Sequence, residues 1–274
     1  MRLDIHALQQ FYAGPVGQAA HAMIERRIAS VWPDANGLDV LGYGYATPWL
    51  GRLAGGARRC VAFMPAGQGV EPWPPGAGPV ASTIGDEDRL PFADAVFDRC
   101  LVVHALEEAS ALRPLLRELW RVTAPEGRLI VIVANRTGLW SRAESTPFGH
   151  GRPFSRSQLG AALTDALFQP AAWARALYAP PLSWRVACGA AESWERTGER
   201  LWPAFGGALL VEAVKRLHVG AAPAPSRRVA FARPLAAQRS AGRGPAHNQG
   251  AGDACANTNA APACGRGRER APIA

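Results

Sequence analysis

The feature that most constrains the fold is a regular alternation of short apolar segments with longer segments of helical periodicity. The apolar segments cover residues 38–41, 59–64, 79–83, 97–103 and 128–133. Between the last two, residues 110–123 place leucines on one side of a helix. Strands that alternate with helices build a parallel sheet with helices on both faces. The sequence therefore predicts an open α/β sandwich.

The segments before and after this pattern differ from it in character. Residues 4–30 have helical spacing, interrupted at Gly14-Pro15, which predicts two short helices. We expect two more strands, at 172–178 and 208–216, to complete the sheet, with a helix at 183–201 between them. Beyond them the chain loses periodicity and apolar content, which is typical of disorder. We expect a helical segment at 1–36, a main domain at 37–220 and a disordered basic tail at 221–274.

The net charge of +8 lies mostly in the tail, which carries eight Arg and two acidic residues. The remaining chain is close to neutral, which argues against a nucleic-acid substrate. The first residues lack the continuous apolar stretch that is typical of a signal peptide, and no apolar run is long enough to predict a membrane span, so we expect a cytoplasmic protein. The five cysteines form no CxxC pair, so no metal site is expected.

Ligands of open parallel sheets bind beyond the carboxyl ends of the strands. The first such loop, Gly42 to Pro48, has glycines that permit a tight turn. A dinucleotide fingerprint would need a third glycine at position 47, where Thr47 stands, and an acidic residue after the second strand. A nicotinamide-dependent oxidoreductase, the third function considered, is therefore the weakest alternative.

A series of motifs at 86–129 carries the most specific signal in the sequence. In order they read DEDRLPF (86–92), ADAVFD (93–98), LVVHALE (101–107), LRELWRV (116–122) and APEGRL (124–129). In type and spacing they resemble the type 11 branch of the class I S-adenosylmethionine-dependent methyltransferases. A closer resemblance is to a subgroup of bacterial methyltransferase-like proteins, through the segments GYGYATP (42–48), MPAGQG (64–69) and TPFGHGRP (146–153).

The resemblance implies a three-layer Rossmann-like sandwich with a mostly parallel seven-stranded sheet and an antiparallel last strand. It implies S-adenosylmethionine as cofactor and transfer of its methyl group; the near-neutral charge of the main domain favours a small-molecule acceptor over a nucleic acid. It also implies cofactor contacts in the first loop, after the second strand and after the third strand. The corresponding positions are Gly42, Tyr43, Gly44, Tyr45, Ala46, Met64, Asp86, Glu87, Asp88 and Leu90.

Two histidines are candidates for the chemistry of methyl transfer. The resemblance places His104, after the fourth strand, close to the sulfonium and the acceptor. His150 lies in a long loop with glycines and aromatic residues, where it could remove a proton from the acceptor. The structural alternatives are a strand-end His104 packed beneath the sheet and a surface His150 whose ring bonds a backbone carbonyl.

The chain departs from the family pattern at two carboxylates. Gly42 occupies the place of an acidic residue before the first loop, and the second strand ends in Phe63-Met64-Pro65-Ala66 without a ribose-binding acid. Each lost hydrogen-bonding group costs on the order of 1–3 kcal/mol. These departures leave open a non-catalytic relative that acts as a binding or regulatory subunit. The helix at 183–201 is expected to cover the substrate or to form a homodimer contact.

Overall fold

A computed structural model describes residues 2–75, 80–181 and 191–217. It divides the chain into compact units at 1–233 and 234–274, and the second unit lies outside the described residues. The disorder expected for 221–274 also falls outside them, and the domain boundaries at 36 and 220 stay predictions.

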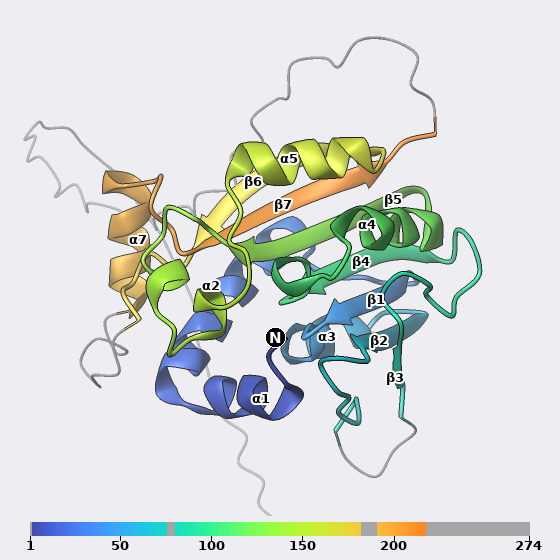
Figure 1. The fold of residues 1–274 in the computed structure, drawn as a ribbon, viewed down its shortest axis with the longest axis horizontal. Helices are drawn as coiled ribbons and strands as arrows, with labels where there is room; N and C mark the ends of the chain where they lie inside the picture. The colour runs from blue at the N-terminus through green and yellow to red at the C-terminus, as the bar shows by residue number, and fades with distance from the viewer. Residues whose placement is uncertain (1, 76–79, 182–190, 218–274) are drawn as a thin grey trace, which may run out of the picture. The chain divides into compact units, whose positions relative to one another are not determined.

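The centre of the structure is a seven-stranded sheet with the order β3-β2-β1-β4-β5-β7-β6 (Figure 1). The strands are β1 (Asp39–Gly44), β2 (Arg59–Pro65), β3 (Ser82–Gly85), β4 (Phe97–Val103), β5 (Thr123–Ala134), β6 (Phe168–Ala176) and β7 (Ala208–Lys215). The first five strands pair in parallel, whereas β7 is antiparallel to both β5 and β6. This topology confirms the expected mostly parallel sheet with an antiparallel last strand.

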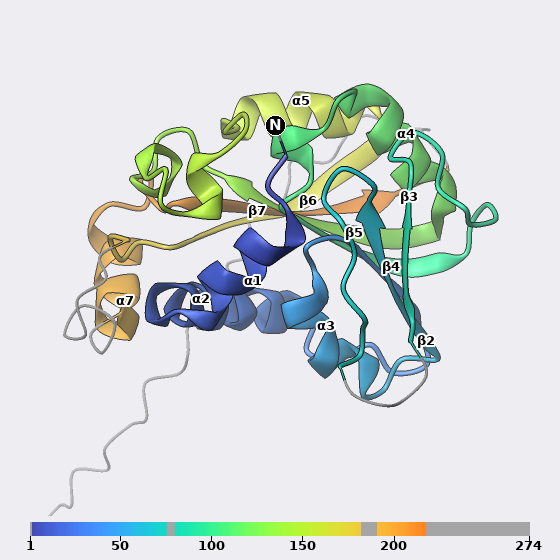
Figure 2. The ribbon, with the colours of Figure 1, turned by 60° about the horizontal axis from the view of Figure 1, so that its bottom comes forward.

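Helices cover both faces of the sheet. They are α1 (Ile5–Ala13), α2 (Pro15–Val31), α3 (Thr47–Ala54), α4 (Leu112–Val122), α5 (Arg156–Asp165) and α7 (Ala191–Leu201). Figure 2 shows α1, α2 and α3 on one side of the sheet and α4 and α5 on the other. Among the described helices, none has the length and apolar character to cross a membrane. The rest of the predicted 183–201 helix, residues 183–190, lies outside the described residues.

Local sequence explains where the two N-terminal helices begin. The Asp4 side chain accepts a hydrogen bond from the Ala7 amide at 2.8 Å and so caps α1. Pro15 opens α2 at a position where its missing N–H is not needed. Leu8 of α1 and Ile24 of α2 are fully buried in one apolar cluster with β1, β2 and α3. Both helices are therefore part of the same core as the sheet.

The carboxyl ends of the parallel strands meet along one edge of the sheet. Gly44 pairs with Val103 across β1 and β4, and Pro65 pairs with Gly85 across β2 and β3. Gly44 has a φ of +75°, and an added Cβ would lie 2.4 Å from the Val103 carbonyl oxygen. Only glycine fits this turn, which brings the first loop against the end of β4.

Candidate functional site

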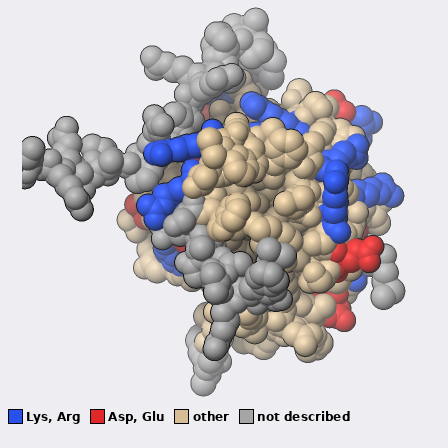
Figure 3. All heavy atoms as spheres, turned by 90° about the vertical axis from the view of Figure 1, so that its left-hand side faces the viewer, with Lys and Arg blue, Asp and Glu red and all other residues tan. Residues whose placement is uncertain are grey.

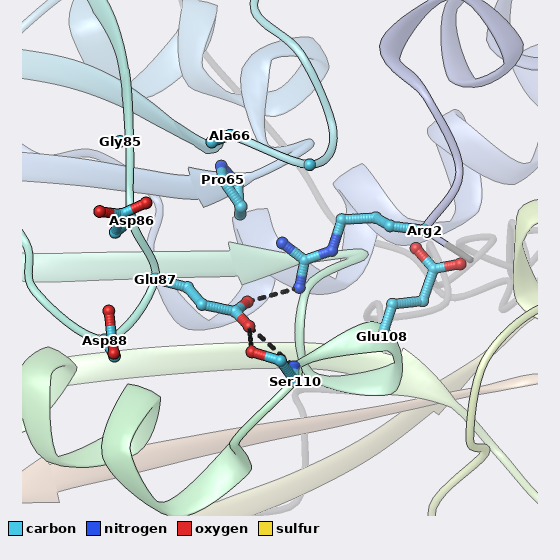
Figure 4. Close-up of a pocket in the computed structure, with 10 residues that line it drawn as sticks. Arg2, Pro65, Ala66, Gly85, Asp86, Glu87, Asp88, Glu108 and Ser110 are labelled. Carbon is cyan, nitrogen blue, oxygen red and sulfur yellow. Dashed lines mark hydrogen bonds and ion pairs between the residues drawn. The ribbon is translucent and has the colours of Figure 1, made fainter.

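A cavity of about 360 Å³ opens at this edge, above the ends of β2 and β3 (Figure 4). Small-molecule sites typically have volumes of about 300–1,000 Å³. Its wall consists of Arg2, Pro65, Ala66, Gly67, Gly85, Asp86, Glu87, Asp88, Glu108 and Ser110. Four carboxylates and one guanidinium thus surround the space. Such a site suits ligands that carry hydroxyls, amines or a positive charge.

The N-terminal residues close one side of the cavity. The Arg2 guanidinium reaches across to Glu87 at 2.6 Å, as Figure 4 shows. The Leu3 amide donates to both carboxylate oxygens of Glu108, at 3.1 and 3.0 Å. The Ile5 amide donates to the Gln68 carbonyl at 2.8 Å. Residues 2–5, which we call the N-terminal strap, are therefore attached to the loops after β2, β3 and β4.

Glu87 is the most strongly bound carboxylate of the cavity. Burial opposes its ionisation, but hydrogen bonds from the Ser110 hydroxyl and amide and the ion pair with Arg2 outweigh this effect and lower its pKa. The carboxylate is therefore ionised at neutral pH. Asp86 and Asp88 flank it and are exposed, so their oxygens are free to accept hydrogen bonds from a ligand.

The predicted cofactor-binding residues divide into two groups. Asp86, Glu87 and Asp88 line the cavity. The residues of the other group are buried and do not belong to its wall: Gly42, Tyr43, Gly44, Tyr45, Ala46, Met64 and Leu90. The Tyr43 ring stacks on Phe63 with centroids 5.5 Å apart, and its buried hydroxyl has no hydrogen-bond partner among the described residues. Burial, with the negative charge of Glu87, raises the pKa of Tyr43.

Aromatic side chains fill the space above β1 and β4, where the resemblance places the methionine part of the cofactor. Tyr12 of α1 stacks on Tyr45 at 5.5 Å, and its hydroxyl lies 2.7 Å from His104 Nε2. His104 is 6% exposed, and desolvation lowers its pKa to about 3. The ring is therefore neutral at physiological pH. It belongs to a closed hydrogen-bonded pair under α1.

Glu107, in the short turn after β4, was not among the predicted site residues. One carboxylate oxygen accepts from the Ala134 amide at 2.9 Å, at the end of β5. The other, Oε2, is buried without a hydrogen-bond partner in the described part of the chain. Desolvation raises the pKa of Glu107 to about 7. Gln68 donates to the His104 carbonyl at 3.4 Å, and its own Oε1 is likewise left without a described partner.

The long loop after β5 packs against the core. Trp140 and Phe148 are 2% and 1% exposed, and the Phe148 ring lies 4.7 Å from that of His104. The His150 ring lies 2.8 Å from the Glu144 carbonyl within the same loop and takes no part in the cavity wall. Its role as a base stays a prediction, as does that of His104.

The sequence prediction missed several residues of this region, for different reasons. Glu107 is the last residue of the LVVHALE motif and Glu108 follows it directly, so the resemblance contained a signal for them. Arg2 and Glu71 have no such signal, because they come from segments without a motif. The structure brings Glu71, beyond β2, back to the first loop, where Thr47 and Gln9 donate to its carboxylate.

Comparison with known proteins finds a family match in the middle of the chain. Residues 38–131 match the family described as the methyltransferase domain. Demethylmenaquinone methyltransferase of Mycolicibacterium paratuberculosis is 46% identical over 52 residues, 19% of this chain and 23% of that protein. Malonyl-acyl carrier protein O-methyltransferase of Erwinia pyrifoliae is 52% identical over 46 residues, 17% and 18% of the two chains. The similarity thus spans about a fifth of each relative.

Two solved structures share the fold at low sequence identity. An S-adenosylmethionine-dependent methyltransferase from Thermotoga maritima has a TM-score of 0.52 and 16% identity, covering 76% of this chain and 94% of its own. A protein described as a 4+2 cyclase has a TM-score of 0.50 and 18% identity, covering 74% and 83%. The fold alone is therefore shared by proteins of different activity. The chain therefore resembles the methyltransferase domain over residues 38–131 and shares its overall fold with an S-adenosylmethionine-dependent methyltransferase of known structure.

Proposed function

We propose that the chain is an S-adenosylmethionine-dependent methyltransferase that acts on a small-molecule acceptor. The observation that carries the proposal is the cavity lined by Asp86, Glu87 and Asp88, which lies at the carboxyl edge of the sheet within the methyltransferase domain. Carboxylates accept hydrogen bonds from the adenine amine and the ribose hydroxyls of the cofactor. This donor set fits the adenosine part of the molecule.

The cofactor supplies an activated methyl group when it is bound, and the protein supplies orientation and exclusion of water. Asp86 and Asp88 would hold the adenosine part, with Glu87 kept in place by Ser110 and Arg2. The N-terminal strap would separate this region from solvent. Tyr12 and His104, bonded at 2.7 Å, occupy the region after β1 and β4 where the resemblance places the methionine part.

The nature of the acceptor rests on the relatives and on charge. The two relatives are named for demethylmenaquinone and for a malonyl group on an acyl carrier protein, and neither is a nucleic acid. On the face with α7, basic side chains lie around the margin of a wide uncharged area instead of covering it (Figure 3). Both observations favour a small organic acceptor. A cytoplasmic location and a homodimer stay predictions.

Titration calorimetry and thermal shift with S-adenosylmethionine and S-adenosylhomocysteine test the proposal. We expect both ligands to bind and to raise the melting temperature. Asp86→Asn should weaken both about tenfold or more, since a hydrogen bond to a charged group contributes about 1.5–3 kcal/mol. Glu144→Gln, an exposed carboxylate in the loop after β5, is the control and should bind like the wild type. Absence of heat and of a melting shift at millimolar ligand would refute the proposal.

A second candidate is a non-catalytic protein of the same fold that binds a partner or a different ligand. Two observations favour it: Tyr12, Tyr45 and His104 fill the crevice above β1 and β4, and the segment 63–66 carries no carboxylate. This candidate predicts that neither cofactor form binds, although the domain folds normally. The same calorimetric titration therefore distinguishes the two.

A further inference from the structure

Glu107 is a carboxyl group in an unusual position. It is 5% exposed, lies in the turn after β4 beside the cavity-lining Glu108, and uses one oxygen to bind the Ala134 amide. Its second oxygen makes no hydrogen bond of ordinary geometry within the described residues, although the backbone amides of Ala105 and Glu107 itself lie close enough to lower the pKa of the carboxyl group, less than burial raises it. No ion pair to Glu107 occurs among these residues either; Arg2, which reaches this turn, binds Glu87 and the Ala105 carbonyl.

Among the described residues, the charged groups that act on Glu107 include no cation. Glu108 in its own turn is acidic, and Tyr12 of α1 is close enough for Glu107 to raise its pKa. His104, which precedes the turn and bonds Tyr12, is neutral because burial lowers its pKa to about 3. Burial of a carboxylate without a neighbouring cation is energetically unfavourable, so Glu107 favours its neutral, protonated form. A cation brought close to it would reverse that preference.

We propose that Glu107 is the counter-charge to the sulfonium of bound S-adenosylmethionine. The inference rests on the proposed function and deepens it. Glu107 holds a proton in the free protein and loses it when the positively charged cofactor binds. With S-adenosylhomocysteine, whose sulfur is neutral, Glu107 keeps its proton. The site thereby prefers the charged substrate form over the neutral product form.

The same carboxylate can receive the proton that methylation liberates. Transfer breaks the bond between the methyl carbon and the sulfur, and the electron pair of that bond stays on the sulfur. The nucleophilic atom of the acceptor forms the new bond to the methyl carbon, and the proton that it carried goes to Glu107. The positive charge of the sulfonium and the negative charge of Glu107 disappear together, so the buried site stays neutral before and after the reaction. The inference therefore favours acceptors that lose a proton, such as hydroxyl compounds or carbon acids.

Calorimetry in two buffers of different ionisation enthalpy, phosphate and imidazole, measures the protons released on binding. With a Glu107 pKa of about 7, we expect S-adenosylmethionine to release about 0.9 proton more than S-adenosylhomocysteine at pH 6.0, and about 0.1 more at pH 8.0. The comparison of the two ligands cancels the titration of their shared amino group. Glu107→Gln should abolish the difference and reduce the preference for S-adenosylmethionine at least tenfold, whereas Glu144→Gln should leave both unchanged.

Each outcome decides the inference. Binding of both ligands with equal proton release at pH 6.0 overturns the role of Glu107 and leaves the proposed function intact. Absence of binding by either ligand overturns both. The dependence on pH in the wild type decides the question even if Glu107→Gln fails to fold.

Discussion

The opposite titrations of Glu107 and His104 predict an unusual dependence of stability on pH. Burial raises the pKa of Glu107 from 4.5 to about 7 and lowers that of His104 from 6.5 to about 3. Between pH 4.5 and 6.5 the folded protein therefore holds a proton on Glu107 that the unfolded chain lacks. Over the same range it lacks a proton on His104 that the unfolded chain holds.

The signs of the two contributions follow from proton linkage. The extra proton on Glu107 makes the free energy of unfolding fall as pH rises from 4.5 to 7. The missing proton on His104 makes it rise between pH 3 and 6.5, so that this stability is lost on acidification. Each slope is about 1.4 kcal/mol per pH unit, and over the two shared units each effect amounts to about 2–3 kcal/mol. In the wild type the two cancel.

Removing one group should expose the slope of the other. As pH rises from 4.5 to 6.5, the free energy of unfolding of Glu107→Gln should increase by about 2–3 kcal/mol relative to that of the wild type. For His104→Asn, the free energy of unfolding should decrease by a similar amount as pH rises over the same range. Asparagine is chosen because it tolerates the φ of +48° at this position. Urea unfolding followed by tryptophan fluorescence, at four pH values across this interval, measures both. Curves for Glu107→Gln that run parallel to the wild type would show that this carboxyl is not the titrating group.

Three other variants test contacts of the fold and the site. Lys215→Met removes an ammonium that donates to two backbone carbonyls at 2.7 Å each, and urea unfolding should show a loss of about 2–4 kcal/mol. Arg2→Met removes the ion pair to Glu87, so amide exchange in the N-terminal strap should accelerate; unchanged exchange would mean that Arg2 does not fasten it. Gly44→Ala places a Cβ 2.4 Å from the Val103 carbonyl oxygen at a residue with a φ of +75°. It should reduce the free energy of unfolding by about 2–3 kcal/mol, measured as a lower melting temperature.

The strands were predictable where apolar runs have clear ends. The segment 97–103 coincides with β4, because the Asp94-Ala95 turn precedes it and His104, in a left-handed conformation, follows it. The start of β5 was placed at 128, but the strand begins at Thr123. Residues 123–127 contain proline, glycine and glutamate, which suggest a turn in the sequence. Pairing of Phe97 with Thr123 nevertheless extends the strand through them, past a register shift.

The site was predictable only where its residues stand in a motif. The acidic run at 86–88 follows a strand end and reaches the cavity wall. Arg2 contacts Glu87 across 85 positions of sequence, and no local pattern specifies such a contact. The first-loop residues were expected at a ligand surface, since strand-end glycines permit close approach. Tyr45 and Ala46 pack in one apolar cluster with Leu8 and Tyr12 of α1, whose apolar face must be buried, whereas Tyr43 packs in the other cluster with Phe63.

The two carboxylates missing from the family motifs do not leave this edge of the sheet without negative charge. Glu71 returns to the first loop from beyond β2 and is held by Thr47, and the cavity wall itself carries four acidic side chains against one arginine. Glu107 adds a buried carboxyl after β4. Because electrostatic attraction depends on position in space and not on position in a motif, the local environment of a cationic ligand remains acidic. What the missing residues remove is a fixed pair of hydrogen bonds to the ribose, which bears on affinity, while the preference for a positive charge depends on Glu107.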